Sequence, residues 1–263
     1  MELGLVGKTA LVTGGSAGIG FACARMLVCE GVHVAIVARS GDRLAHAKAS
    51  LENLGIDVRV VTISGDLGQA ADVERVVAEA RHALGKIDIL INCAGSARGG
   101  NFLELRDEAF LDAWNLKLLG YIRMTRAVAH EMVARRDGRI VNIVGGAART
   151  PSAEFLTGST ANAALINFTR GVSKELAKHN VRIVAISPGA TATERAERLL
   201  EDEMRLRGLT REEAWAARVK AIPLARMVDP DEIAALAALA VSDRMPSMTG
   251  CEILIDGGAA PGV

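Results

Sequence analysis

The sequence predicts an α/β fold, a single doubly wound domain with a seven-stranded parallel sheet flanked by helices on both faces. Short apolar segments alternate with longer segments of helical periodicity along all 263 residues. The short segments are apolar throughout, as strands are when helices cover both faces of a sheet. The repeated strand–helix order favours parallel strands joined by right-handed crossovers.

The apolar segments are expected to be strands because they are short and apolar throughout. In chain order they are Thr9–Thr13, Val32–Val37, Val58–Ile63, Ile87–Ile91, Arg139–Val144, Val181–Ile186 and Glu252–Ile255. The expected helices between them are Ile19–Cys29, Asp42–Leu54, Asp72–Leu84, Glu108–Ala134, Ser159–His179 and Pro230–Ala240. No linker or repeat divides this series, so residues 1–263 are expected to form one domain.

The composition excludes several classes of partner. Lys and Arg number 31 and Asp and Glu also number 31, so the balance of charge favours neither nucleic acid nor an anionic membrane as a partner. No basic segment followed by an apolar run begins the chain, and no stretch approaches ~18 uninterrupted apolar residues. We therefore expect no signal peptide, no membrane span and a cytoplasmic protein.

The cysteines give no sign of a metal site or a disulfide. The four of them are scattered, without a Cys-x-x-Cys pair or a His at ligand spacing. Small buried residues in a reducing compartment are the simplest interpretation. No metal site is predicted.

The segment Thr193–Val228 interrupts the strand–helix rhythm. It follows the sixth expected strand, carries many charges of both signs, and has an apolar minority that includes Leu200, Met204 and Trp215. Open α/β sheets bind ligands at the carboxyl ends of their strands, so a long insertion there favours a helical substrate lid over residues 193–228. A solvated helical hairpin with a small apolar face is the alternative.

A glycine-rich loop follows the first expected strand. Gly14, Gly18 and Gly20 lie between Thr13 and the first helix. Residues without Cβ let the backbone approach a phosphate closely, and the free N–H groups at a helix start attract its charge. The strand–turn–helix context predicts a dinucleotide site here.

The spacing Gly-x-x-x-Gly-x-Gly resembles the short-chain dehydrogenase/reductase family, whose members have a Rossmann-type fold. Further segments resemble the same family, and the likeness covers nearly the whole chain. Within the family the chain resembles the 3-oxoacyl-carrier-protein reductases. These segments are Asn92-Cys93-Ala94-Gly95, Pro188-Gly189 with Thr193, Ile222-Pro223-Leu224-Ala225-Arg226, and Thr249-Gly250 through Asp256-Gly257-Gly258.

The resemblance implies a set of cofactor contacts. The glycine loop, with Ser16 and Ile19, would hold the pyrophosphate, and Asp66 and Leu67 would flank the adenine. The segment after the fourth strand would border the adenosine ribose, the segment after the sixth would meet the nicotinamide half, and Asn162 would bond the nicotinamide ribose. The implied contacts are Gly14, Ser16, Gly18, Ile19, Gly20, Arg39, Asp66, Leu67, Asn92, Ala94, Gly95, Asn162, Pro188, Gly189, Thr191 and Thr193.

Arg39 favours NADP(H) over NAD(H), although NAD(H) stays possible. NAD-selective members have an acid where Ala38 stands, which binds the ribose hydroxyls. Arg39 instead offers a guanidinium that can pair with a 2′-phosphate. The alternative is that Arg39 only stacks on the adenine.

The four side chains that perform the family's usual chemistry are expected to be missing. Family members use a Tyr as proton donor, a Lys four residues later, a Ser on the substrate oxygen and an Asn that holds a water. Register along the matching segments places the Asn at Lys117, the Ser at Gly145, the Tyr at Gly158 and the Lys at Asn162. Placing Asn115 at the first position instead would require a two-residue shift within a helix.

The remaining polar candidates are Lys117, Ser159 and Asn162. A lysine desolvated beside a cofactor has a lowered pKa and can donate a proton, and its ammonium can polarise a carbonyl. Gly158 would leave a void that Lys117 could fill; the alternative is a lysine extending off the helix surface. Tyr121, the single tyrosine, is expected in the core or an interface.

The sequence therefore favours an NADP-dependent carbonyl or alcohol oxidoreductase with altered proton delivery. Its substrate would be a medium-sized, partly apolar carbonyl or alcohol. The alternatives are an inactive NADP(H)-binding sensor or partner subunit, and a lyase or isomerase that uses Lys117. Family likeness further implies a homotetramer or homodimer formed through the two longest helices.

Overall fold

The strands form one parallel sheet of seven in the order β3-β2-β1-β4-β5-β6-β7. This computed structural model describes residues 2–260, apart from the side chains at positions 199, 202, 203 and 206. The strands are β1 Thr9–Thr13, β2 His33–Ala38, β3 Val60–Ser64, β4 Ile89–Asn92, β5 Gly138–Ile143, β6 Val181–Pro188 and β7 Glu252–Ile255. The predicted fold class is confirmed.

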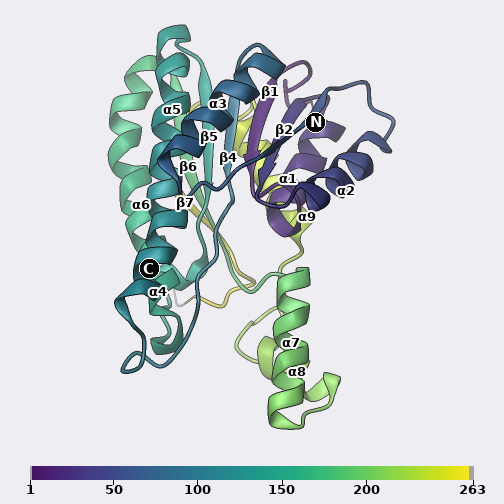
Figure 1. The fold of residues 1–263 in the computed structure, drawn as a ribbon, viewed down its shortest axis with the longest axis vertical. Helices are drawn as coiled ribbons and strands as arrows, with labels where there is room; N and C mark the ends of the chain where they lie inside the picture. The colour runs from purple at the N-terminus through teal and green to yellow at the C-terminus, as the bar shows by residue number, and fades with distance from the viewer. Residues whose placement is uncertain (1, 261–263) are drawn as a thin grey trace.

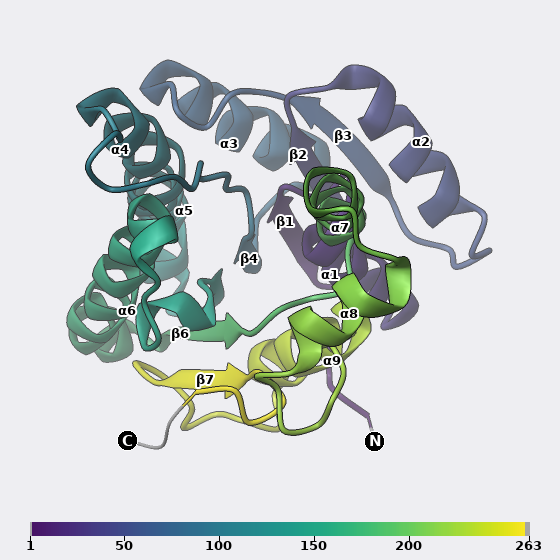
Figure 2. The ribbon, with the colours of Figure 1, turned by 90° about the horizontal axis from the view of Figure 1, so that it is seen from below.

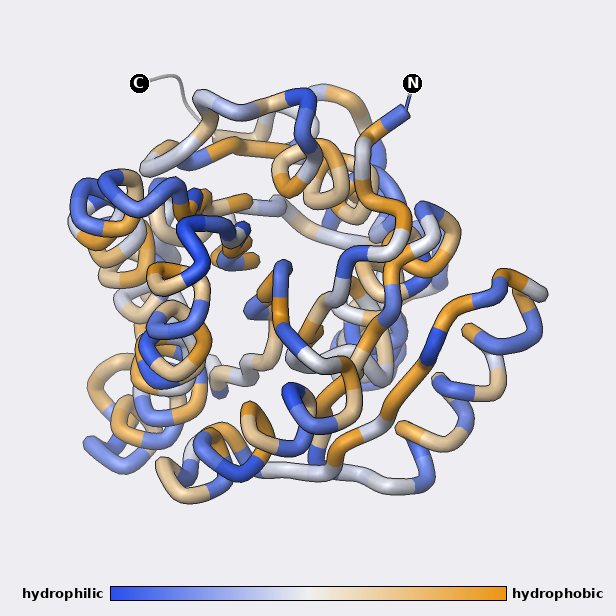
Figure 3. Tube along the Cα trace, turned by 90° about the horizontal axis from the view of Figure 1, so that it is seen from above, coloured by the Kyte–Doolittle hydropathy of each residue, from blue (hydrophilic) through white to orange (hydrophobic). Residues whose placement is uncertain are grey.

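Helices cover both faces of the sheet (Figure 1). One face carries α1 Gly18–Cys29, α2 Gly41–Glu52 and α9 Pro230–Val241, and the other carries α3 Ala70–Leu84, α5 Gly120–Arg135 and α6 Leu156–Leu176. Short helices are α4 Asp107–Ala113, a π-helix at Trp114–Leu119, and 3₁₀ turns at Gly146–Ala148, Ala153–Phe155 and Ala177–His179. Figure 3 shows hydrophobic residues along the strands and alternating bands along the helices, as helices with one buried face require.

Two apolar cores hold the layers together. The first packs β-strand residues such as Val12 and Ile36 against α1 and α9, and the second packs Leu11 and Leu90 against α3 and α5. Successive strand residues point to opposite faces, so Leu11 and Val12 enter different cores. The uniform apolar character of the strands follows from this two-sided burial.

The segment after β6 leaves the body of the fold (Figure 1). It contains α7 Glu194–Arg207 and α8 Arg211–Val219, each opened by a threonine that caps it. Thr210 and Glu213 form a reciprocal capping box on α8. Seen from below, α7 and α8 lie beside the carboxyl ends of the central strands (Figure 2).

The prediction of one continuous α-helix over Glu108–Ala134 is wrong for the middle of that range. A π-helix at Trp114–Leu119 separates α4 from α5, so the hydrogen bonds widen there. The side chain of Asn115 donates to the carbonyl of Gly68 at 2.8 Å and accepts from Arg123 at 2.9 Å, which anchors the wide turn to the loop after β3. Among the described residues no helix is long and apolar enough to cross a membrane.

Candidate functional site

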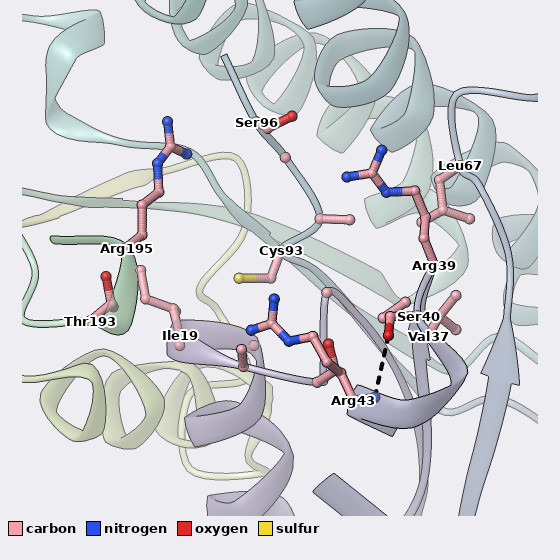
Figure 4. A pocket seen from close by; sticks show the side chains of 18 of the residues that line it. Ile19, Val37, Arg39, Ser40, Arg43, Leu67, Cys93, Ser96, Thr193 and Arg195 are labelled. Atoms are coloured by element: carbon pink, nitrogen blue, oxygen red, sulfur yellow. Dashed lines mark hydrogen bonds between the residues drawn. The ribbon is translucent and has the colours of Figure 1, made fainter. Parts of the chain in front are cut away.

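The sheet order reverses between β1 and β4, and a cavity of about 480 Å³ opens at their carboxyl ends. Connections from neighbouring strands leave in opposite directions at such a point, which makes a crevice for a ligand. The cavity is bordered by the glycine loop, the ends of β2 and β4, and the start of α7 (Figure 4).

The glycine loop needs its glycines for two close approaches. Gly14 has a φ of +67°, and a Cβ there would lie 3.1 Å from the backbone N of Ala94. A Cβ on Gly20 would lie 2.3 Å from the carbonyl oxygen of Gly14. The loop therefore folds tightly enough to expose backbone N–H groups at the start of α1, where they suit a phosphate.

Thr13 fixes the geometry between the two central strands. Its hydroxyl accepts the N–H groups of Cys93 and Ala94 at 2.9 and 3.1 Å and donates to the carbonyl of Ile91 at 3.4 Å. This buried hydroxyl holds the loop after β4 against the glycine loop. The backbone of Ala94 and Gly95 is thereby brought to the cavity wall.

Two guanidinium groups line the far end of the cavity. Arg39 follows β2, and Arg43 lies in the first turn of α2, which is capped by Ser40. Figure 4 shows Arg39 beside Leu67, with Ser40 between the side chains of Arg39 and Arg43. Arg39 was predicted from the sequence but Arg43 was not, because only the fold of α2 brings position 43 back to the end of β2.

A second cavity of about 460 Å³ adjoins the first and shares Ile19, Cys93 and Gly95 with it. Its wall comes from the ends of β5, β6 and β7 and from the π-helix. Predicted residues in this wall are Ile19, Gly95, Lys117, Gly145, Asn162, Pro188, Gly189 and Thr191. Of the residues predicted on the nicotinamide side, Pro188, Gly189 and Thr191 line this cavity, whereas Thr193 lines the first one.

Lys117, and not Asn115, faces this second cavity. Its Nζ donates to the carbonyl of Val144 at 2.5 Å, and its methylenes pack against Gly95. Burial of the ammonium lowers the pKa of Lys117 to about 8, with Cys93 opposing that shift and Arg195 adding to it. One N–H of the ammonium is used by Val144, so the others can reach a ligand.

Gly158 does not leave a void, and the expectation that Lys117 fills one is wrong. A Cβ on Gly158 would lie 2.2 Å from Cζ of Phe155, because the Phe155 ring already occupies that space. Phe155 lines the cavity there and was not predicted from the sequence. No motif marks it, and only the 3₁₀ turn before α6 folds it back over position 158.

Gly145 and Asn162 lie next to each other in the same wall. Gly145 has a φ of +137°, and a Cβ there would lie 2.9 Å from Nδ2 of Asn162. Asn162 is 3% exposed, and its Oδ1 has no hydrogen-bond partner among the described residues. A buried acceptor without a donor costs free energy, so this oxygen is suited to a ligand hydroxyl.

Several predicted site residues do not line either cavity. The Ser159 hydroxyl is buried and donates to the carbonyl of Leu156 at 3.3 Å. Asn92 is buried behind the loop, where its amide donates to Thr125 and Asn142. The Asp66 carboxylate accepts the N–H of Gly68 instead of pointing into the cavity.

Tyr121 is a core residue, as predicted. It is 2% exposed, and its hydroxyl donates to the carbonyl of Ile143 at 3.0 Å. Burial raises its pKa well above the usual value, so it stays neutral. Its role is to tie α5 to the end of β5.

The start of α7 closes the first cavity. Thr193, Glu194, Arg195 and Arg198 all line it, and of these only Thr193 was predicted. Arg195 crosses the cleft and donates to the carbonyl of Ala97 at 3.1 Å. Within residues 2–260 no cluster of His, Cys, Asp and Glu is arranged to hold a metal ion.

Comparison with known proteins agrees with this architecture. The family model for short chain dehydrogenases matches residues 8–204. Oxidoreductase UcpA of Salmonella typhimurium is 35% identical over 258 residues, covering 97% of this chain and 95% of that protein. NADPH-dependent reductase BacG of Bacillus subtilis is 30% identical over 96% of this chain and 97% of its own length.

A solved structure is also very similar. L-sorbose reductase from Gluconobacter frateurii, crystallised with NADPH and L-sorbose, superposes with a TM-score of 0.96 at 30% identity, over 100% of both chains. The fold, the glycine loop at the β1–β4 crevice and the matched relatives lead to one conclusion. The chain belongs to the short-chain dehydrogenase family.

Proposed function

We propose that this protein is an NADP(H)-dependent oxidoreductase of carbonyls or alcohols in which Lys117 delivers the proton. The observation that carries the proposal is the position of Lys117: its ammonium faces the second cavity, which adjoins the one at the glycine loop, and its pKa is lowered to about 8. A general acid is most effective when its pKa is close to the working pH.

The residues present fit a dinucleotide. Gly14 and Gly20 leave a cradle that a Cβ would fill, and the unpaired Oδ1 of Asn162 suits a ribose hydroxyl. When bound, the nicotinamide supplies or accepts a hydride. The glycine loop would hold the pyrophosphate and Thr193 the nicotinamide end, as the family likeness implies.

Preference for NADP(H) rests on Arg39 and Arg43. Both line the end of the cavity at β2, and that strand ends in Ala38 where a carboxylate would bind a ribose 2′-hydroxyl. Two guanidinium groups can form charge-assisted hydrogen bonds to a 2′-phosphate. NADPH-bound reductases among the similar structures support this choice.

Proton delivery would run through Lys117 Nζ. The bond to Val144 orients the ammonium, and Gly95 holds the methylene chain in place. The ammonium can stabilise the oxygen of a carbonyl substrate as negative charge develops and then protonate it. Lys117 thus replaces a tyrosine for which Phe155 leaves no room.

The substrate we propose is a small, partly apolar carbonyl or alcohol. Apolar side chains of Ile143, Ala147 and Phe155 share the second cavity with the polar groups of Thr150 and Asn162. A cavity of about 460 Å³ accommodates a small molecule of mixed character. The segment 193–228 would act as its lid.

The test is NADPH oxidation measured against ketoses, diketones and aldehydes, with L-sorbose and levodione included because similar structures are named for them. Wild-type protein is expected to oxidise NADPH with at least one of these compounds. Lys117→Met is expected to lose about 10²–10⁴-fold in kcat, the usual contribution of a general acid. Turnover that survives Lys117→Met unchanged would refute the assigned role.

A nucleotide-binding sensor is the second candidate, favoured by the loss of functional side chains at Gly145 and Gly158 and by the ring of Phe155 over position 158. A sensor is expected to bind NADPH tightly, and no carbonyl compound should oxidise the bound NADPH. A lyase or isomerase based on Lys117 is a further alternative, which borohydride trapping of a carbonyl on Lys117 would support.

We also propose that copies of the chain associate through α5 and α6, as homodimers or homotetramers. A shallow apolar groove lies on the outer faces of these helices, lined by Ile122, Ala129, Val133, Phe168 and Val172 among others. Exposed apolar grooves of this kind mark protein contacts. Light scattering of wild type and Val172→Asp tests this proposal, with dissociation expected for the variant.

A further inference from the structure

The arginines at the start of α7 are not explained by the proposed function. Arg195 and Arg198 are three residues apart on α7, so they lie on the same side of the helix, and both line the first cavity. Figure 4 shows Arg195 extending from the start of α7 toward the loop that follows β4. We call Arg195 and Arg198 the α7 arginine pair.

The α7 arginine pair is held close to the glycine loop. Thr193, which caps α7, lies so near that a Cβ on Gly18 would be 3.4 Å from its Cγ2. The N-termini of α1 and α7 therefore meet at one cleft, and the arginines project from the first turns of α7. The bond from Arg195 to the carbonyl of Ala97 places its guanidinium over the loop after β4.

The charge around the cavity is strongly unbalanced. Its lining includes Arg39, Arg43, Arg195 and Arg198 but a single carboxylate, Glu194. Glu194 forms an ion pair with Arg43 at 3.3 Å. Neither member of the α7 arginine pair forms an ion pair with a carboxylate among the described residues. Guanidinium groups that line a cleft without a carboxylate to neutralise them favour a multiply charged anion there.

We propose, resting on the proposed nucleotide site, that the α7 arginine pair binds the diphosphate of the nucleotide from the side opposite the glycine loop. Arg39 and Arg43 lie at the other end of the cavity, by β2, and are left for the 2′-phosphate. The helix start and the arginine pair then enclose the diphosphate between α1 and α7. Nucleotide binding would thereby hold the segment 193–228 against the sheet.

The two sets of arginines make different predictions for different ligands. NADPH and NADH share the diphosphate, whereas adenosine 2′-monophosphate carries only the 2′-phosphate. The double variant Arg195→Gln/Arg198→Gln is therefore expected to bind NADPH and NADH more weakly to the same extent. The affinity should fall about tenfold for each charge-assisted hydrogen bond that the variant can no longer form. Its affinity for adenosine 2′-monophosphate is expected to equal that of wild type.

The measurements are calorimetric titrations with these three ligands and trypsin digestion of the lid, which offers Arg205, Arg207 and Arg211 as cleavage sites. NADPH is expected to slow cleavage of wild type and to protect the double variant far less. Lys220→Gln, at an exposed position of the same segment outside the cavity, is the matched control for the titrations and should bind all three ligands as wild type does.

The outcomes separate this inference from the proposed function. If wild type binds neither NADPH nor NADH, the proposed function fails. If wild type binds both and the double variant binds both equally well with the same tryptic protection, the nucleotide site stands and the role of the α7 arginine pair is overturned. A loss confined to NADPH would also overturn it, because the pair would then bind the 2′-phosphate.

Discussion

The ring of Phe155 lies where a side chain on Gly158 would have to be, with Cζ 2.2 Å from the position of a Cβ. Such a distance is far below any van der Waals contact, so a side chain at position 158 would require the Phe155 ring to move. The glycine thus leaves the space that the aromatic ring of Phe155 occupies. If position 158 corresponds to the family's tyrosine, as the resemblance implies, a tyrosine there would have to displace the Phe155 ring.

Gly158→Ala is expected to destabilise the fold by about 1–3 kcal/mol, because overpacking displaces the Phe155 ring. Phe155→Ala should relieve the clash, so the double variant should be more stable than the sum of the single effects predicts. Urea unfolding of the four proteins measures this coupling. If the two single changes in unfolding free energy summed to that of the double variant, the Phe155 ring and a side chain at position 158 would not compete for the same space.

Replacing Gly145 by Ser is not expected to restore a useful hydroxyl. A φ of +137° is strained for any residue with a Cβ, and the new atom would crowd Nδ2 of Asn162 at 2.9 Å. We expect a loss of about 1–3 kcal/mol in unfolding free energy. Gly171→Ser is the matched control, since Gly171 has open space around it, and it should be near neutral. Equal effects at both positions would contradict the strain argument.

Arg43→Gln is expected to weaken NADPH binding about tenfold and to leave NADH binding unchanged, because only NADPH carries the 2′-phosphate. Glu194→Gln is expected to strengthen NADPH binding, because it removes the carboxylate that forms an ion pair with Arg43 at 3.3 Å. Fluorescence titrations with both nucleotides provide the measurement. If Arg43→Gln weakened the binding of NADPH and NADH equally, Arg43 would not be a ligand of the 2′-phosphate.

Lys117→Met is expected to raise stability at pH 7. The pKa of Lys117 falls from 10.5 to about 8 in the folded protein, so the unfolded chain binds more protons between these values and stability rises with pH there. Below about pH 8 the buried charge costs up to about 3 kcal/mol. The advantage of Lys117→Met over wild type should therefore shrink between pH 8 and 10.5.

Urea unfolding across this pH range tests the effect. Lys174→Met, at an exposed position on α6, controls for the loss of a lysine. A difference between Lys117→Met and wild type that does not change with pH would mean that Lys117 is not desolvated.

Sequence patterns predicted the fold and the first cavity well. The strands are apolar because both faces are buried, and the glycine loop is local in the chain, so both leave a readable signal. Arg39 was predicted because it directly follows a strand. Arg43, Arg195 and Arg198 were missed because their approach to the cavity depends on the course of α2 and α7 in space.

The second cavity was predicted only in part. The register that placed Lys117 in the cavity agrees with the structure, although the helix carrying it widens to a π-helix that periodicity does not reveal. Ser159 and Asn92 are polar and lie at expected positions, but their groups are bonded within the protein. Sequence position alone does not tell which way such side chains point, and Phe155 shows the same limit.

The most direct test of the central claim is the pH dependence of kcat for carbonyl reduction by NADPH. If Lys117 donates the proton, kcat should be level below about pH 8 and fall about tenfold per pH unit above it, as the ammonium deprotonates. Lys117→Arg should keep some activity without that fall. A wild-type profile that stays level through pH 9.5, or one that Lys117→Met reproduces, would contradict the account.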